Sequence, residues 1–291
     1  MVGVEKSFAK KLCTLNNEFY RAHAASFSAT RTSPWNGWHV CATELCALPE
    51  DTCRATPSGG VLQDSGTRLN AILDLACGNL RFEAFLHEKL APRAFDFLAV
   101  DDCAGLIDAH HSDARAGEKI TFQELDIVDA LIENEALEDL IGCAAAGFDA
   151  KTCFDASVCF GFMHHLPTQE MRAALLNALI GKTRTGGLVM ISFWEFLNNE
   201  GLAAKAEVTH AAALADLHLT DGEQAQLDEH DFFLGWKDTQ HSYRYCHSFN
   251  GDEIDELLAL PSIASRTEVV RRFHADGRSD NLNEYLMLRV V

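Results

Sequence analysis

The sequence predicts an α/β fold with a doubly wound, mostly parallel sheet of seven strands. From residue 71 onward, short apolar segments alternate with amphipathic segments, and the apolar ones lack a polar face. Strands of this kind are typical of a parallel sheet that helices cover on both sides. Right-handed crossovers between such strands produce the doubly wound arrangement.

The composition indicates one large globular domain with additions. The chain has 291 residues, of which 47% are hydrophobic and 23% charged, and this excludes a disordered or fibrous protein. No run of 18 apolar residues occurs, and the N-terminus lacks the apolar core of a secretory signal, so we expect a cytoplasmic protein without a membrane segment. Ten cysteines without a CxxC pair favour reduced, buried thiols over a zinc ribbon.

The net charge argues against unaided binding of nucleic acid. Lys and Arg number 24 and Asp and Glu 43, which gives a formal charge of −19. Such a charge repels a polyanion unless basic residues cluster locally. A small-molecule partner is therefore favoured on charge.

Residues 1–60 are predicted to form an N-terminal helical cap and loop. Residues 4–25 have helical periodicity, and the loop SFSATRTSPWNGW follows them. A second helical segment, near residues 38–47, leads into EDTCRATPSGG, whose small polar residues are typical of a surface connector.

Residues 61–196 are predicted to form the core of the fold. The five expected strands are AILDLA, FDFLAVD, KITFQELD, CFDASVCFG and GGLVMISFW. The clearest helices between them are LRFEAFLHEKL and TQEMRAALLNALIGK.

Residues 197–250 are expected to be an insertion, helical and partly acidic over 197–228, that contributes to the acceptor side of the site. Residues 251–291 then complete the core with a helix, GDEIDELLAL, and two closing strands, RTEVVRRFHADG and NEYLMLRVV.

The strongest functional signal is ILDLACGNLRF at the end of the first strand. Asp74 ends the strand and Gly78 follows in the turn, where a carboxylate and backbone amides meet at the carboxyl edge of the sheet. Gly78 allows a cofactor to approach the backbone closely. The alternative interpretation is a tight strand-to-helix turn without a ligand.

The second signal is AVDDC, in which Asp101 and Asp102 end the next strand. A carboxylate at this place in α/β nucleotide sites accepts hydrogen bonds from both ribose hydroxyls, and Asp101 is the preferred candidate. A solvated strand end is the alternative. Because the first turn has one glycine and lacks the G-x-G-x-x-G pattern, we expect a nucleoside cofactor without a pyrophosphate.

With these residues the chain resembles the class I S-adenosylmethionine-dependent methyltransferases, which have a Rossmann-like fold. Their first motif is usually an Asp followed by a Gly-x-Gly turn, and here Leu80 stands where the last glycine is expected. LDI at 125–127, FDASVCFGFMHHL and TRTGGLVMISF match later motifs in order. The resemblance implies S-adenosyl-L-methionine as cofactor. The residues that it implies as cofactor-binding are Asp74, Ala76, Cys77, Gly78, Asn79, Asp101, Asp102, Asp126, Ile127 and Phe160.

A narrower resemblance extends to the flanking segments. SFSATRTSPW, FMHHL, FFLGWK and YRYCHSFNGDEIDELL are similar to the eukaryotic wobble-uridine carboxymethyl methyltransferases, which esterify a carboxymethyl group on a tRNA anticodon base. This resemblance implies tRNA as acceptor and a small zinc-ribbon protein as activator. The closing segment differs from that group, and an acidic stretch near 220–231 replaces its lysine-rich insertion.

Methyl transfer is an in-line displacement, so the protein has mainly to position the acceptor and exclude water, without a metal or a covalent residue. An acceptor carboxylate is already ionised at pH 7 and needs cationic groups to orient it. Arg31 is the first candidate and Arg244 the second. Two other interpretations of Arg31 are that it holds the methionine carboxylate of the cofactor and that it is a solvated surface residue.

His165 is a further candidate for the acceptor pocket, although either it or His164 can be a core histidine. Tyr243 and His247 are as readily structural as functional. Trp194, Trp236 and Phe196 can stack a base, but such residues near a sheet edge more often belong to the core. No ligand spacing indicates a metal site. A small-molecule O- or N-methyltransferase and a non-catalytic cofactor-binding module remain as alternative functions.

Overall fold

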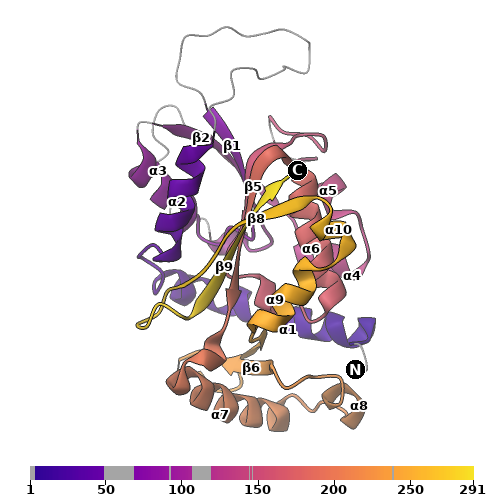
Figure 1. Cartoon of the computed structure of the whole chain (residues 1–291). Helices are drawn as coiled ribbons and strands as arrows, with labels where there is room; N and C mark the ends of the chain where they lie inside the picture. The colour runs from indigo at the N-terminus through magenta and orange to yellow at the C-terminus, as the bar shows by residue number, and fades with distance from the viewer. Residues whose placement is uncertain are drawn as a thin grey trace, which may run out of the picture.

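The computed structural model describes residues 4–48, 69–91, 93–106, 119–143, 145, 147–237 and 239–291. In this part of the chain, helices cover both faces of a central sheet, and a smaller layer containing α7 and β6 lies beyond one end of it (Figure 1). The predicted connector EDTCRATPSGG and the predicted boundary between residues 60 and 61 lie outside the described residues.

The central sheet has seven strands in the order β3-β2-β1-β4-β5-β9-β8. The first five pair in parallel, and β9 is antiparallel to both of its neighbours, which confirms the predicted fold class. The strands are β1 (Leu69–Leu75), β2 (Ala94–Asp101), β3 (Lys119–Glu124), β4 (Phe154–Cys159), β5 (Thr183–Trp194), β8 (Thr267–Ala275) and β9 (Asn283–Val290). The strand order reverses between β1 and β4, and ligands of such sheets bind outside the carboxyl ends at this point.

Both faces of the sheet are buried, as the apolar segments predict. In β1, Leu73 and Leu75 face one core cluster and Ile72 faces the other. The first cluster packs on α4 (Ile127–Ile132), α5 (Leu137–Leu140), α6 (Gln169–Lys182), α9 (Gly251–Leu258) and α10 (Pro261–Ala264). The second packs on α2 (Gly37–Ala47) and α3 (Arg81–Leu90). The two layers hold the strand ends, and thus the functional turns, in fixed positions.

Helix α1 (Lys6–Ser28) runs across the molecule between the sheet and the layer that contains α7 and β6 (Figure 1). The insertion begins with α7 (Glu200–Asp216) and α8 (Asp221–Gln224), as predicted. Its second half is not helical, because Asp231–Gly235 (β6) and Tyr243–His247 (β7) form an antiparallel pair.

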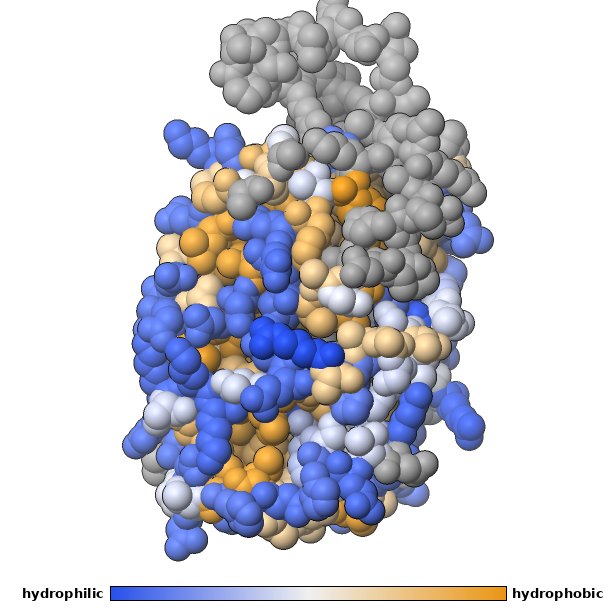
Figure 2. All heavy atoms as spheres, turned by 180° about the vertical axis from the view of Figure 1, so that it is seen from behind, coloured by the Kyte–Doolittle hydropathy of each residue, from blue (hydrophilic) through white to orange (hydrophobic). Residues whose placement is uncertain are grey.

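Alternating aromatic residues explain the hairpin. Phe233 and Tyr245 are fully buried and pack on Phe8 and Leu12 of α1, so the hairpin fixes α1 against the body of the protein. The rear face of the molecule carries mainly hydrophilic side chains with apolar ones between them (Figure 2). Among the described residues, every helix is too short or too polar to span a bilayer.

Candidate active site

A cavity of about 420 Å³ lies at the carboxyl ends of β1, β2 and β4. Every residue predicted for the site lines it, namely Arg31, Asp74, Ala76, Cys77, Gly78, Asn79, Asp101, Asp102, Asp126, Ile127, Phe160, His165 and Arg244. Segments far apart in the sequence thus meet in one cavity, with the sheet on one side and α1, its following loop and β7 on the other.

The turn after β1 is fixed to β2 by its backbone. The amides of Ala76 and Cys77 donate to the carbonyl of Val100 at 2.7 and 3.1 Å. The Gly78 amide donates to the Asp101 carboxylate at 2.9 Å. Gly78 has a φ of +58°, and a Cβ added there meets no atom within 4 Å. The missing side chain therefore leaves the cavity open beside the turn.

Leu80 occupies the position where the resembling family has glycine. Its φ of 59° lies in the left-handed region, which costs a residue with a Cβ roughly 1–2 kcal/mol. The side chain is buried against Cys77 and Ala99, and this packing offsets part of the backbone cost. The turn therefore has the left-handed backbone conformation that glycine favours, although leucine stands at this position.

Asp101 holds the turn and the end of β2 together. One carboxylate oxygen accepts from Gly78 and the other accepts the Cys103 amide at 3.0 Å. Asp102 lies beside it, 3.9 Å from the guanidinium of Arg21. Burial, followed by repulsion from Asp101, raises the pKa of Asp102 to about 6.

Asp126 caps α4 and also contacts α1. Its carboxylate accepts the Asp129 amide at 2.9 Å and the side-chain amide of Asn17 at 3.0 Å. Asp74, Asp101, Asp102 and Asp126 form what we call the acidic lobe of the cavity. Among the described residues, the acidic lobe makes one ion pair, which joins Asp102 to Arg21. Four carboxylates with so little compensation favour a cationic ligand.

Arg31 and Arg244, which line the same cavity, form what we call its basic lobe. Arg244 is 6% exposed, and its Nε and Nη1 atoms have no hydrogen-bond partner among the described residues. Its guanidinium lies 4.9 Å from the ring centre of Phe19, and that of Arg31 lies 3.3 Å from the ring centre of Phe27. Trp236 is close to both, at 5.6 and 5.9 Å.

Burial lowers the pKa of Arg31 to about 10, and repulsion from Arg244 contributes to the shift. A buried charge without a counter-ion is costly. The buried Arg244 and the partly buried Arg31 line the same cavity and therefore favour an anionic ligand there, and the forked geometry of guanidinium suits a carboxylate.

His165 lies between the basic lobe and α1. Its Nε2 atom is 2.8 Å from the hydroxyl of Tyr20, and its Nδ1 atom is 3.0 Å from the carbonyl of Tyr245. Burial lowers its pKa to about 3, so the ring stays neutral and one nitrogen accepts while the other donates. His165 thus orients the hydroxyl of Tyr20, which lines the cavity.

The other aromatic and histidine candidates divide between the cavity and the core. His164 and Trp194 line the cavity, whereas Tyr243, His247, Trp236 and Phe196 are not among its lining residues. His247 is fully buried and bonds to Asp231 and Glu253 at 2.8 Å on either side of its ring. It therefore has a structural role in the hairpin.

Sequence reasoning missed several lining residues, namely Asn16, Asn17, Tyr20, Thr30, Trp35, Trp38, Arg81 and Phe82. The loop after α1 comes close to the end of β4, because a Cβ added at Gly161 would lie 2.9 Å from Trp35. The aromatic residues of SFSATRTSPWNGW were the available signal for this contact.

No protein-family model matches the chain, and no curated protein matches it by sequence. Many solved structures resemble the chain in three dimensions, among them two methyltransferases. An S-adenosylmethionine-dependent methyltransferase from Methanosarcina mazei is 16% identical, with 77% of this chain and 93% of that chain covered and a TM-score of 0.51. One from Clostridium acetobutylicum is 13% identical, with 94% and 98% covered and a TM-score of 0.50. The chain therefore has the fold of the class I methyltransferases.

Proposed function

We propose that the protein is an S-adenosylmethionine-dependent methyltransferase whose acceptor carries a carboxylate. The observation that carries the proposal is one cavity lined both by the four carboxylates of the acidic lobe and by Arg31 and Arg244, neither of which has an ion-pair partner among the described residues. S-adenosylmethionine is a cation with ribose hydroxyls and an adenine amine, and the acidic lobe fits these groups.

The proposed cofactor contacts follow from the place of each residue. Asp101 and Asp102, at the end of β2, accept the ribose hydroxyls, and Asp126 accepts the adenine amine. Ala76, Cys77, Gly78 and Asn79 form the turn beside the methionine portion, and Ile127 and Phe160 supply apolar contacts. When bound, the cofactor supplies an electrophilic methyl group on a sulfonium.

The basic lobe orients the acceptor. Arg244 and Arg31 donate hydrogen bonds to its carboxylate, and the rings of Phe19, Phe27 and Trp236 keep water from the far side of the two cations. No general base is required, because a carboxylate is ionised at neutral pH. His165 is neutral and acts by positioning Tyr20. Catalysis then depends on proximity and orientation.

For the acceptor, we propose a carboxymethyl group on a tRNA wobble uridine. The support is the segment SFSATRTSPW, because it supplies Arg31 to the basic lobe and resembles the group with that activity. The net charge of −19 makes a basic partner protein necessary for tRNA, in the role of the small activator. The same charge favours the second candidate, a small carboxylic acid.

The test uses S-adenosylmethionine with a radiolabelled methyl group, offered separately with bulk tRNA and with a small-molecule extract. Label in tRNA that mild alkali removes supports the wobble-uridine ester, and alkali-labile label in the small-molecule fraction supports the small acid. Binding of the cofactor without label in either fraction contradicts catalysis and favours a binding module. Arg244→Gln should lose the label, whereas Arg278→Gln, at an exposed position, should keep it.

A further inference from the structure

Two buried acidic side chains meet behind the turn of the cofactor site. Glu83 lies in the first turn of α3 and is 1% exposed, and Asp74 is the last but one residue of β1 and is 3% exposed. Their carboxyl groups lie within hydrogen-bonding reach of each other. Neither oxygen of Glu83 has a donor partner among the described residues. Asp74 lines the cavity, whereas Glu83 lies behind it.

The other titratable groups facing this pair are also acidic. They are Asp101 from β2, Cys77 from the turn and Cys159 from β4. Burial, with repulsion between the two acids, raises the pKa of Asp74 well above its usual range, and burial raises the pKa of Glu83 to about 7. Two ionised carboxylates are acceptors only, so a hydrogen bond between them requires a proton.

We propose that Asp74 and Glu83 share one proton in the free protein and release it when the cationic cofactor enters the acidic lobe. The inference rests on the proposed cofactor. It makes Glu83 a positioning residue: its carboxyl holds the Asp74 side chain toward the cavity without touching the ligand. The arriving ammonium group replaces the proton as the compensating charge, and the proton leaves to solvent.

The direction of the pH effect follows from linkage. If binding releases a proton, the affinity for the cofactor rises as the pH rises, by at most about tenfold per pH unit for one proton. The ligand's own amine also titrates near neutral pH, so the effect must be measured as a difference between variants.

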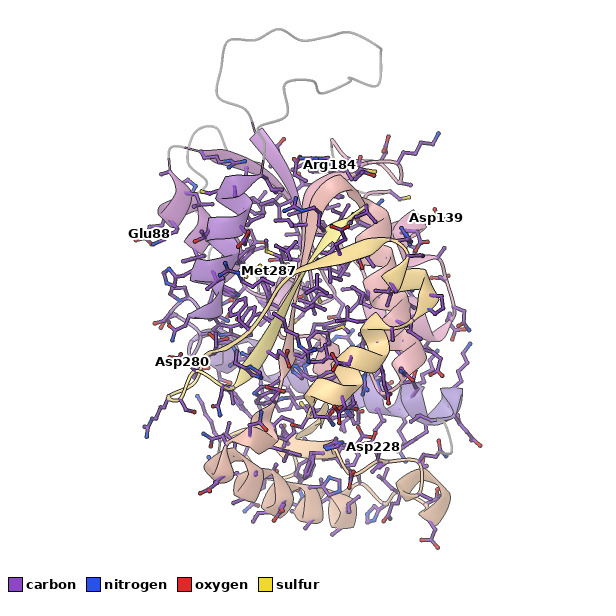
Figure 3. The ribbon with its side chains drawn as sticks, viewed as in Figure 1. Glu88, Asp139, Arg184, Asp228, Asp280 and Met287 are labelled. Atoms are coloured by element: carbon purple, nitrogen blue, oxygen red, sulfur yellow. The ribbon has the colours of Figure 1, made fainter. Side chains whose placement is uncertain are left out.

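Calorimetry at about pH 7.5, above the pKa of Glu83, with S-adenosylhomocysteine in buffers of different ionisation enthalpy measures the protons released on binding. The proteins are the wild type, Glu83→Gln and a matched control, Glu88→Gln. Glu88 lies on the same helix and points outward from the molecule (Figure 3). The amide of Gln donates permanently to Asp74 and keeps the shape of Glu83. We expect Glu83→Gln to release about half a proton or more fewer than the wild type and the control, because the shared proton is gone.

Equal proton release by the wild type and Glu83→Gln would overturn the inference. Infrared difference spectra provide a second measurement that needs no variant. The free wild type should show a protonated-carboxyl band that disappears on binding, and its absence from the free protein would overturn the shared proton. Failure of the wild type to bind S-adenosylhomocysteine would instead contradict the proposed cofactor, so the two failures are distinguishable.

Discussion

The acidic and basic lobes of the cavity are built from different parts of the molecule. The acidic lobe consists of strand ends and turns of the parallel sheet, and backbone amides hold Asp101 and Asp126 in place. The basic lobe consists of a loop and a hairpin outside the sheet, and aromatic rings hold Arg31 and Arg244. The acidic lobe therefore depends on the central sheet, whereas the basic lobe depends on segments outside that sheet.

The largest effect should come from breaking the acidic lobe at Asp101. In Asp101→Ala, the amides of Gly78 and Cys103 lose a charged acceptor, so the free energy of unfolding should fall by about 3 kcal/mol. Calorimetry should show that S-adenosylhomocysteine binds at least about 100-fold more weakly, with Glu88→Gln as the unaffected control. Wild-type affinity in Asp101→Ala would exclude Asp101 from the cofactor site.

A substitution in the basic lobe should lower the activity without lowering the stability of the protein. Arg244→Met removes a buried charge that has no counter-ion among the described residues, so the protein should be as stable as the wild type or more stable by about 1 kcal/mol in chemical denaturation. Its kcat/KM for the carboxylate acceptor should nevertheless fall about 30-fold, the equivalent of one charged hydrogen bond. Binding of S-adenosylhomocysteine should be unchanged. Loss of this binding would show that the arginine serves the cofactor instead.

A smaller effect is expected at Tyr20, which lies between the lobes. Tyr20→Phe removes one neutral hydrogen bond to His165, so kcat/KM should fall about fivefold. Because burial lowers the pKa of His165 to about 3, its ring is already neutral at pH 5 and above. The wild-type pH–rate profile should therefore contain no step from this histidine between pH 5 and 9. A step that disappears in His165→Gln would show that it takes up a proton.

The smallest effect concerns the backbone of the acidic lobe at Leu80. Leu80→Ala loses the packing on Cys77 and Ala99 but keeps the left-handed conformation, whereas Leu80→Gly loses the packing and relieves that conformation. Leu80→Gly should therefore be about 1 kcal/mol more stable than Leu80→Ala in chemical denaturation. Equal stability of the two variants would mean that the turn is not strained.

The same contrast explains what the sequence predicts well. The strands of the acidic lobe are short apolar segments with Asp at their ends, and Asp74 and Asp101 are recognisable from neighbouring residues alone. The hairpin that carries Arg244 has mixed polar and aromatic residues, and its strands form because Phe233 and Tyr245 pack on α1. That packing joins distant segments, so local periodicity does not indicate it.

The sequence also does not predict the residues whose role depends on contact with another side chain. Tyr20 lies in a helical segment where an aromatic residue usually indicates packing, and its role depends on His165 far along the chain. Glu83 has the spacing of an ordinary helix residue, and its burial against Asp74 becomes visible only when α3 lies on the sheet. Their partners, and not their own sequence context, determine their chemistry.

Within the part of the chain that the structure describes, neither Arg31 nor Arg244 is in an ion pair, and in the proposed reaction this distinguishes substrate from product. The proposed carboxylate acceptor brings one negative charge to the two cations, whereas its methyl ester carries none and leaves the buried Arg244 without compensation. Replacement of the bound ester by a new molecule of the acid therefore lowers the free energy of the complex. Turnover would then not depend on a separate opening movement to expel the ester, and the free acid should compete with the labelled substrate far better than the ester does.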